Sequence, residues 1–354
     1  MKTRQAIAGL NTYIPGERRK DAIKLSSNEN PLGCSPAAAR AVEDAVRELN
    51  FYPDGGAREL TAAIAAHHRV TPEQVITGNG SDEVLLYLAG TYLEAGERVL
   101  IAEHTFSEYE FAARLYGAEI VAVPMPELAI RPMDYLPHID AATRIVFLCS
   151  PNNPTGSAFS HEELVRFLDA APADVLVAVD HAYVEYQDDP GAANADSLVG
   201  RYPNLVVLHT FSKIHGIAAV RLGYALATAE RIAEMKKVRP PFSVNSVAQA
   251  AGLAALSDPD FVRRSQEVNA SGIAQLRELC HELGYRYLPS QANFLAVNVE
   301  QDAREAAEFI AGHGVTVRAL TGFNLPTWLR ISIGTAEQMQ ILAGALRALA
   351  EQRR

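Results

Sequence analysis

The sequence predicts an α/β protein with a large domain, built on a mostly parallel central sheet, and a smaller α+β domain. Two observations support this fold class. From residue 74 onward, short apolar runs alternate with segments of helical periodicity, an order typical of a parallel sheet covered by helices. Several of these runs end in clusters of glycine, asparagine, aspartate or lysine. Ligands bind to open α/β sheets at the carboxyl ends of their strands.

Length and composition indicate a globular protein. The chain has 354 residues, enough for two domains, and 48% of them are apolar and 21% charged. Its formal net charge of −10 argues against nucleic-acid binding. The N-terminus lacks the apolar segment of a signal peptide, and no apolar run approaches the ~18 residues of a membrane helix. We therefore expect a cytoplasmic protein that binds neither nucleic acid nor a membrane.

The three cysteines, Cys34, Cys149 and Cys280, are scattered and lack CxxC spacing. This pattern fits a reducing compartment. It predicts neither a disulfide framework nor a zinc site, and we expect no metal.

The first 35 residues show little periodicity but contain two stretches dense in turn residues, 13–17 and 26–33. These stretches could form a surface loop or an arm laid over a binding site, and the residues alone leave both open. Ser35 and Pro36 then predict the start of a helix, with Ser35 as N-cap and Pro36 at the first helical position. Another turn cluster, residues 50–56, follows this helix.

The other elements follow from the spacing of apolar residues. Strands are expected at residues 74–77, 98–101, 118–123, 144–148, 174–179, 205–208, 286–297 (with a bend), 315–318 and 329–333. Helices are expected at residues 84–93, 106–116, 228–238, 243–256, 258–283, 303–313 and from 336 onward. A capping box at residues 160–163 opens one more helix.

A glycine-rich turn, residues 78–83, joins the strand at 74–77 to the helix at 84–93. Free backbone N–H groups and the helix dipole make such a helix N-terminus a cradle for phosphate. The third glycine of the dinucleotide fingerprint G-x-G-x-x-G is missing, so a single phosphate fits better.

Lys213 lies just beyond the strand predicted at 205–208. It could be an ordinary surface lysine in a loop. Alternatively, desolvation disfavours its ammonium form, and a neutral amine can attack an aldehyde. Thr210, Ser212 and Arg221 could hold a dianion beside it. An aldehyde that carries a phosphate is pyridoxal phosphate (PLP).

Two more polar clusters follow predicted strands. The strand at 144–148 leads into Ser150–Gly156, a rigid turn rich in proline and asparagine, and the strand at 174–179 delivers Asp180 to the same edge of the sheet. A carboxylate at the end of a buried strand needs a cation or hydrogen-bond donors. Taken alone, Asp180 could also cap a helix or form a buried salt bridge.

Seven motifs occur in a characteristic order: SNENPLG, NxYPDG, GNGSDE, SPNNPTG, VDxAY, TFSK and RxGY. With this order the chain resembles the fold-type I PLP-dependent aminotransferases, and within them it is most similar to the histidinol-phosphate aminotransferases. The likeness extends from Tyr13 to Thr335, nearly the whole chain. Seven motifs in order are far more specific than any one of them.

The resemblance implies a role for each residue that would contact the reacting part of the cofactor. Lys213 would hold PLP covalently and move the proton between the substrate Cα and C4′ of the cofactor. Asp180 would pair with the pyridine nitrogen and keep it protonated. Asn153 and Tyr183 would hydrogen-bond the phenolic oxygen, and Tyr109 would stack on the ring.

The resemblance also implies the anion-binding groups. The cofactor phosphate would be held by the backbone at Ser81 and Asp82 and by Thr210, Ser212 and Arg221. Tyr52 would reach the phosphate in the neighbouring subunit, which implies a homodimer with shared active sites. Arg330 would take the substrate carboxylate, and Tyr13 and Arg318 lie where the subfamily binds the phosphate of its substrate.

The resemblance implies a PLP-binding large domain, residues 36–239, and a discontinuous small domain, residues 1–35 and 240–354, with an N-terminal arm. The implied reaction converts histidinol phosphate and 2-oxoglutarate to imidazole acetol phosphate and glutamate, and back, in histidine biosynthesis. An aromatic amino acid aminotransferase, a PLP decarboxylase or lyase acting on a phosphorylated amino acid, and a PLP-binding protein without activity are alternatives. The site motifs are compatible with all of these PLP enzymes, so they do not distinguish between them.

Four residues depart from the family pattern: Phe51, His181, His215 and Ala219. None of them removes a proposed catalytic group. Since adjacent residues of a strand point to opposite faces, we expect His181 to face away from the cofactor ring and to play a structural part.

Overall fold

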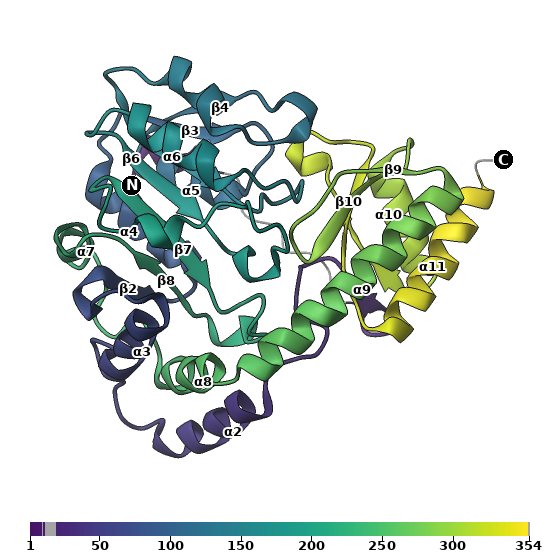
Figure 1. Ribbon diagram of the computed structural model, residues 1–354, viewed down its shortest axis with the longest axis horizontal. Coiled ribbons are helices and arrows are strands. Elements are labelled where there is room, and N and C mark those ends of the chain that lie inside the picture. Colours follow the sequence, from purple (N-terminus) through teal and green to yellow (C-terminus); the bar gives the residue numbers. More distant parts are fainter. Residues whose placement is uncertain (9, 11–18, 353–354) are drawn as a thin grey trace.

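The computed structural model describes residues 1–8, 10 and 19–352. Figure 1 shows two lobes, a larger one that contains the central sheet and a smaller one that contains the C-terminal helix. A short helix, α1 (Gln5–Ala8), begins the described chain. In the part of the chain that the structure describes, no helix has the length and apolar character needed to cross a membrane.

The central sheet has seven strands in the order β2-β8-β7-β6-β5-β3-β4. Strand β8 runs antiparallel to both its neighbours, and every other pairing in this sheet is parallel. The strands are β2 (Val75–Gly78), β3 (Arg98–Ala102), β4 (Glu119–Val123), β5 (Thr143–Cys149), β6 (Leu176–Asp180), β7 (Leu205–Thr210) and β8 (Gly223–Leu226). The predicted mostly parallel sheet is therefore confirmed, whereas β8 was not predicted.

Helices cover this sheet and bury a large apolar core against it (Figure 1). They are α2 (Pro36–Ala45), α3 (Arg58–His68), α4 (Ser81–Tyr92), α5 (Ser107–Leu115), α6 (His161–Ala170) and α7 (Ala229–Met235). The predicted caps are present, since Ser35 accepts from the Ala38 N–H and Ser160 forms a capping box with Glu163. Helix α3 was not predicted.

The small lobe is an α+β unit with its own core. Its antiparallel sheet has the order β12-β13-β10-β9. The strands are β9 (Arg286–Tyr287), β10 (Phe294–Asn298), β12 (Arg318–Ala319) and β13 (Trp328–Ser332), and the helices are α9 (Pro259–Leu283), α10 (Ala303–Gly312) and α11 (Ala336–Glu351). The predicted bent strand at 286–297 is two strands, β9 and β10, joined by an irregular segment that bends at residues 291–293.

The N-terminal segment packs with the small lobe. Strand β1 (Ile23–Lys24) pairs in parallel with β11 (Val315–Thr316), and Leu25 joins the small-lobe core. Helix α8 (Ser246–Leu256), beyond the expected boundary at residue 239, instead packs on α2 and α3 and contributes to the large core. We therefore propose that the large domain extends to about residue 257.

Candidate active site

A cavity of about 270 Å³ lies between the two lobes, at the carboxyl ends of β5, β6 and β7. The large lobe supplies the start of α4, the small lobe supplies β12 and β13, and residues 26–29 form another wall. The predicted site residues that line it are Ser81, Asp82, Tyr109, Asn153, Asp180, Tyr183, Thr210, Ser212, Lys213, Arg221, Arg318 and Arg330. Tyr13 lies outside the described residues, and Tyr52 does not line this cavity.

Asp180, the last residue of β6, is buried beneath the cavity. Its Oδ2 accepts a hydrogen bond of 2.6 Å from the Tyr109 hydroxyl, and its Oδ1 accepts one of 2.9 Å from the Ala182 N–H. Burial raises the pKa of Asp180, and these two donors oppose the shift. No lysine or arginine among the described residues forms an ion pair with Asp180, so the carboxyl group is suited to a cationic partner inside the cavity.

The stacking role expected for Tyr109 does not fit this arrangement. Its side chain is fully buried, its hydroxyl is bonded to Asp180, and its ring stacks on Phe147 at 4.7 Å. Phe106, one helical turn earlier, is partly exposed and lines the cavity. Phe106 is therefore the aromatic group that is placed to contact a ring in the cavity, and Tyr109 supports Asp180.

Lys213 extends into the cavity from the loop after β7. Its Nζ lies 3.3 Å from the backbone oxygen of Ser27 and 5.5 Å from the centre of the Tyr183 ring. Desolvation, followed by the positive charge of Arg330, lowers the pKa of Lys213 to about 8. The amine is thus neutral in a sizeable fraction of molecules near pH 8, as a nucleophile or a base must be.

The phosphate cradle is assembled by close backbone contacts. Helix α4 begins at Ser81 after Gly80, whose φ of +84° is in the left-handed region. A β-carbon on Gly223 would lie 2.2 Å from the Ser81 nitrogen, so only glycine lets β8 approach the helix N-terminus this closely. Arg221 reaches the same place and donates to Asp82 Oδ2 at 2.9 Å. Backbone N–H groups, a helix dipole and a guanidinium therefore meet at one point.

Two arginines face each other in the small-lobe sheet. In the register of β12 and β13, Arg318 lies opposite Arg330, and both line the cavity. Arg330 is buried and donates to the Asn153 side chain and to the Ser26 carbonyl oxygen at 2.8 Å. Like charges directly opposite each other on a sheet repel. An anion bound between the two guanidinium groups would remove that repulsion.

Residues 26–30 form an arm over the site, so the alternatives are decided for the second turn-rich stretch, whereas residues 13–17 lie outside the described residues. Asn28 is buried, and its Nδ2 donates to the Tyr183 hydroxyl at 2.9 Å. Its Oδ1 accepts from the Ser332 hydroxyl at 2.9 Å, and Asn30 Nδ2 donates to the Ile214 carbonyl at 2.8 Å. The arm thus links both lobes to the loop that carries Lys213.

Two aromatic residues of the NxYPDG motif lie on the surface. Tyr52 has 84% of its surface exposed and stacks on Phe242 at 4.8 Å, and Phe51 is 68% exposed. Such exposure is unusual for large aromatic side chains and is typical of surfaces that bind another molecule.

His181 does not line the cavity, as expected for the residue after Asp180. It is buried on the other side of the chain, near Asp196 and His209. His215 is also buried, and its ring contacts Phe211.

Sequence reasoning missed Phe106 and Asn28 as site residues. The aromatic character of Phe106 at the start of a helix after a strand was the available signal for it.

Comparison with known proteins places these features in context. Residues 20–346 match the family model for aminotransferases of class I and II. The histidinol-phosphate aminotransferase of Halalkalibacterium halodurans is 41% identical, over 99% of this chain and 97% of that protein. The enzyme of the same name from Symbiobacterium thermophilum is 42% identical, over 98% of each chain. Among solved structures, the histidinol-phosphate aminotransferase of Sinorhizobium meliloti in complex with pyridoxal-5′-phosphate aligns with a TM-score of 0.91 and 27% identity, over 100% of this chain and 98% of that one.

Proposed function

The chain belongs to the aminotransferase class I and II family, and from this premise we propose that it is a PLP-dependent aminotransferase acting on histidinol phosphate. The amino group would pass to 2-oxoglutarate, which gives imidazole acetol phosphate and glutamate. The observation that carries the proposal is one cavity that contains Lys213 and Asp180 on the large-lobe side and two opposed arginines on the small-lobe side. Relatives of this name, about two fifths identical over nearly the whole chain, support the substrate.

The residues of the cavity fit PLP. Asp180, buried and lacking a cationic partner among the described residues, would pair with the pyridine nitrogen. The N-terminus of α4, Arg221, Thr210 and Ser212 would hold the phosphate. Asn153 and Tyr183 would hydrogen-bond the phenolic oxygen, and Phe106 would contact the ring. When bound, PLP supplies the electron sink that makes the Cα–H of the substrate acidic.

Lys213 would attach the cofactor and afterwards act as the base. Because its pKa is lowered to about 8, part of the amine is neutral, and Nζ would take a proton from the substrate Cα and deliver it to C4′ of the cofactor. The hydrogen bond from Tyr109 holds the Asp180 carboxylate in one orientation, in which its charge would stabilise a protonated ring nitrogen. Residues 26–30 cover the site and limit the access of water.

The two arginines would bind the anions of both substrates. Histidinol phosphate carries a phosphate and lacks a carboxylate, whereas 2-oxoglutarate carries two carboxylates. Arg330 can serve either as a planar fork, and Arg318 adds a second guanidinium for the dianionic phosphate. Tyr13 remains a candidate for the same phosphate.

We also propose that the enzyme is a homodimer in which Tyr52 reaches the cofactor phosphate of the partner subunit. The exposed rings of Phe51, Tyr52 and Phe242 support an interface at this surface. Analytical ultracentrifugation of the wild type should give twice the mass of one chain. A monomer with full activity would contradict the shared site.

The function is tested by the absorbance of the purified protein. PLP attached to a protein amine gives a yellow colour, and borohydride should fix the pyridoxyl mass on the peptide that contains Lys213. A single turnover with histidinol phosphate should abolish the band. Histidinol, phenylalanine and tyrosine should react more slowly; faster reaction of phenylalanine or tyrosine would instead identify an aromatic aminotransferase. Lys213→Ala should lower turnover by about 10⁴-fold, because nucleophile and base are lost together.

A further inference from the structure

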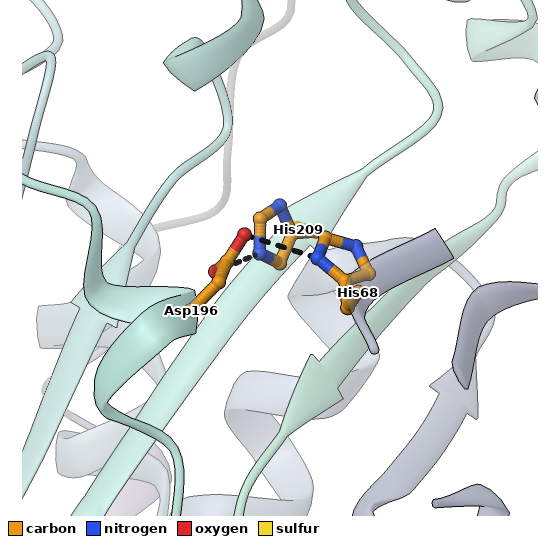
Figure 2. Close-up of side chains that lie close together, drawn as sticks. All are labelled: His68, Asp196 and His209. Atoms are coloured by element: carbon orange, nitrogen blue, oxygen red, sulfur yellow. Dashed lines mark hydrogen bonds and ion pairs between the residues drawn. The ribbon is translucent and has the colours of Figure 1, made fainter. Parts of the chain in front are cut away.

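Three histidines and an aspartate from distant parts of the chain meet outside the catalytic cavity. Figure 2 shows the Asp196 carboxylate pointing toward the rings of His68 and His209. His68 ends α3, Asp196 lies in the 3₁₀ helix Ala195–Leu198, and His209 is in β7. None of them lines the cavity, and His209 precedes the cavity residue Thr210, so it points to the opposite face of the sheet.

The distances within this cluster are short. His209 Nε2 lies 2.8 Å from Asp196 Oδ1, and His68 Nδ1 lies 3.0 Å from Asp196 Oδ2. One ligand atom from each of the three residues lies within 4.8 Å of the others. His181 lies beside these three residues, with its Nδ1 3.6 Å from Asp196 Oδ1, which is too far for a hydrogen bond.

The carboxylate of Asp196 is surrounded by imidazoles. Among the described residues its ion-pair partners are histidines only, and no lysine or arginine reaches it. The carboxylate therefore has no permanently charged partner there, and imidazole and carboxylate are ligand types that zinc accepts.

Several imidazole nitrogens in the cluster lack hydrogen bonds. The side chain of His181 is 0% exposed, and neither of its ring nitrogens is hydrogen-bonded to another described residue. The same holds for His209 Nδ1. Buried polar atoms are nearly always paired with protein, water or an ion. The unpaired buried nitrogens beside the Asp196 carboxylate therefore point to a further partner of this cluster, an ion or water.

We propose that His68, Asp196 and His209 bind a Zn²⁺ ion. Zinc takes nitrogen and oxygen ligands at about 2.0–2.2 Å in a tetrahedron, whose edges are then roughly 3.4 Å long, and a site with three protein ligands leaves the fourth position to water. The two imidazole-to-carboxylate separations, 2.8 and 3.0 Å, are close to that length, and the three ligand atoms lie within 4.8 Å of one another. The ligand atoms are His68 Nδ1, His209 Nε2 and one oxygen of the Asp196 carboxylate.

The surroundings also suit a metal. His68 Nε2 lies 2.7 Å from the Tyr224 hydroxyl, and metal-bound histidines are commonly oriented by such a contact at the other ring nitrogen. The side chain of Asp196 is 21% exposed, so an ion can enter from solvent. The ion neutralises the carboxylate and joins α3, the 3₁₀ helix and β7. The expectation that the protein binds no metal was based on its scattered cysteines. The proposed site uses imidazole and carboxylate ligands instead, so the cysteine pattern could not predict it.

Metal content of the untagged, PLP-loaded wild type tests the proposal directly. After incubation with zinc and removal of free metal, plasma mass spectrometry should find about one zinc per chain. Zinc added to chelator-treated protein should raise the melting temperature in a concentration-dependent way, because it binds only the folded chain. Less than about 0.1 zinc per chain in protein with full PLP content would overturn the proposal and leave a hydrogen-bonded cluster, with or without water.

Variants locate the ion. His209→Gln and Asp196→Asn should each lose the zinc and the melting-temperature response, whereas His313→Gln, an exposed histidine, should keep both. His181→Gln should weaken zinc binding by about 10- to 100-fold. If one of these two variants fails to fold, the zinc content of the other variant and of the wild type still tests the proposal. Zinc retained in both would place it elsewhere and overturn the assignment. None of these results depends on the substrate of the enzyme.

Discussion

Single residues decide how the cavity recognises anions. Arg318 and Arg330 face each other across β12 and β13, and among the described residues no carboxylate forms an ion pair with Arg318. A substrate phosphate would supply that missing charge. The two arginines therefore contribute more to the binding of a dianion than to the stability of the sheet.

Arg318→Ala should raise the KM for histidinol phosphate by about 10- to 100-fold, because a charge-assisted hydrogen bond to a desolvated anion is worth roughly 1.5–3 kcal/mol. The absorbance spectrum of the bound cofactor should not change. Steady-state kinetics measure the effect, with Arg286→Ala, an exposed arginine of the same lobe, as control. An unchanged KM in Arg318→Ala would contradict a role in substrate binding.

Lys213 gives a prediction about stability and pH. In protein freed of PLP, its pKa is about 8 in the folded chain against an ordinary value of 10.5. The unfolded chain therefore binds more protons between these values, and stability rises with pH across that window. The destabilisation caused by burying the ammonium is complete below pH 8 and disappears above pH 10.5.

Lys213→Met removes this titration. The variant should therefore exceed the PLP-free wild type in free energy of unfolding by a larger margin at pH 7 than at pH 10. Guanidinium unfolding curves at both pH values measure the margin. A margin that is the same at both would show that Lys213 titrates as an ordinary exposed lysine.

At the scale of elements, the approach of β8 to the start of α4 shapes the phosphate cradle. Gly223→Ala should force the two apart, because its β-carbon would lie 2.2 Å from the Ser81 nitrogen. Overpacking of this kind costs about 1–3 kcal/mol. We expect that loss in the free energy of unfolding together with weaker PLP binding, measured by denaturant unfolding and cofactor titration.

A glycine in open space provides the control. A β-carbon on Gly344, in α11, would meet no atom within 4 Å. Gly344→Ala should stabilise the protein by about 1 kcal/mol through helix propensity and leave PLP binding unchanged. If Gly223→Ala behaves in the same way, the contact between β8 and α4 is not tight in solution.

The sequence was informative about elements with strong periodicity and about residues inside motifs. Most strands of the central sheet were predicted to within two residues, and the residues expected around the cofactor line one cavity, with the exceptions of Tyr13 and Tyr52. Strand β8 was missed because it has only four residues, the first two of which, Gly223 and Tyr224, belong to the RxGY motif, and because it shows no alternation. Phe106 and Tyr109 are one helical turn apart, so spacing alone could not tell which ring faces the cavity.

The histidine cluster could not be predicted for a different reason. His68, His181, Asp196 and His209 come from four segments, and none of them belongs to a recognisable metal motif. Only the packing of α3 against the sheet brings His68 close to the other three residues. Contacts of this kind depend on tertiary structure, which composition and periodicity do not encode.

At the scale of the whole molecule, the arm at residues 26–30 joins the two lobes. Asn28 bonds Tyr183 of the large lobe and Ser332 of the small lobe through its side-chain amide. Asn28→Ala should lower the free energy of unfolding by about 1–3 kcal/mol, because two buried hydroxyl groups lose a partner. Denaturant unfolding measures the loss, with the exposed Gln340→Ala as control. An equal stability of both variants would mean that the arm does not fasten the lobes.

The antiparallel strand β8 also has a consequence for the synthesis of the protein. Gly78, at the end of β2, pairs with Gly223, so the two sides of the phosphate cradle are far apart in the order of translation. At about 5–20 residues per second, a ribosome needs roughly 7 to 30 seconds between them. During that interval the N-terminus of α4 has neither β8 nor Arg221 beside it. A nascent chain therefore cannot hold PLP in its finished cradle until most of the large lobe has left the ribosome, and cofactor capture belongs to the last stage of the enzyme's production.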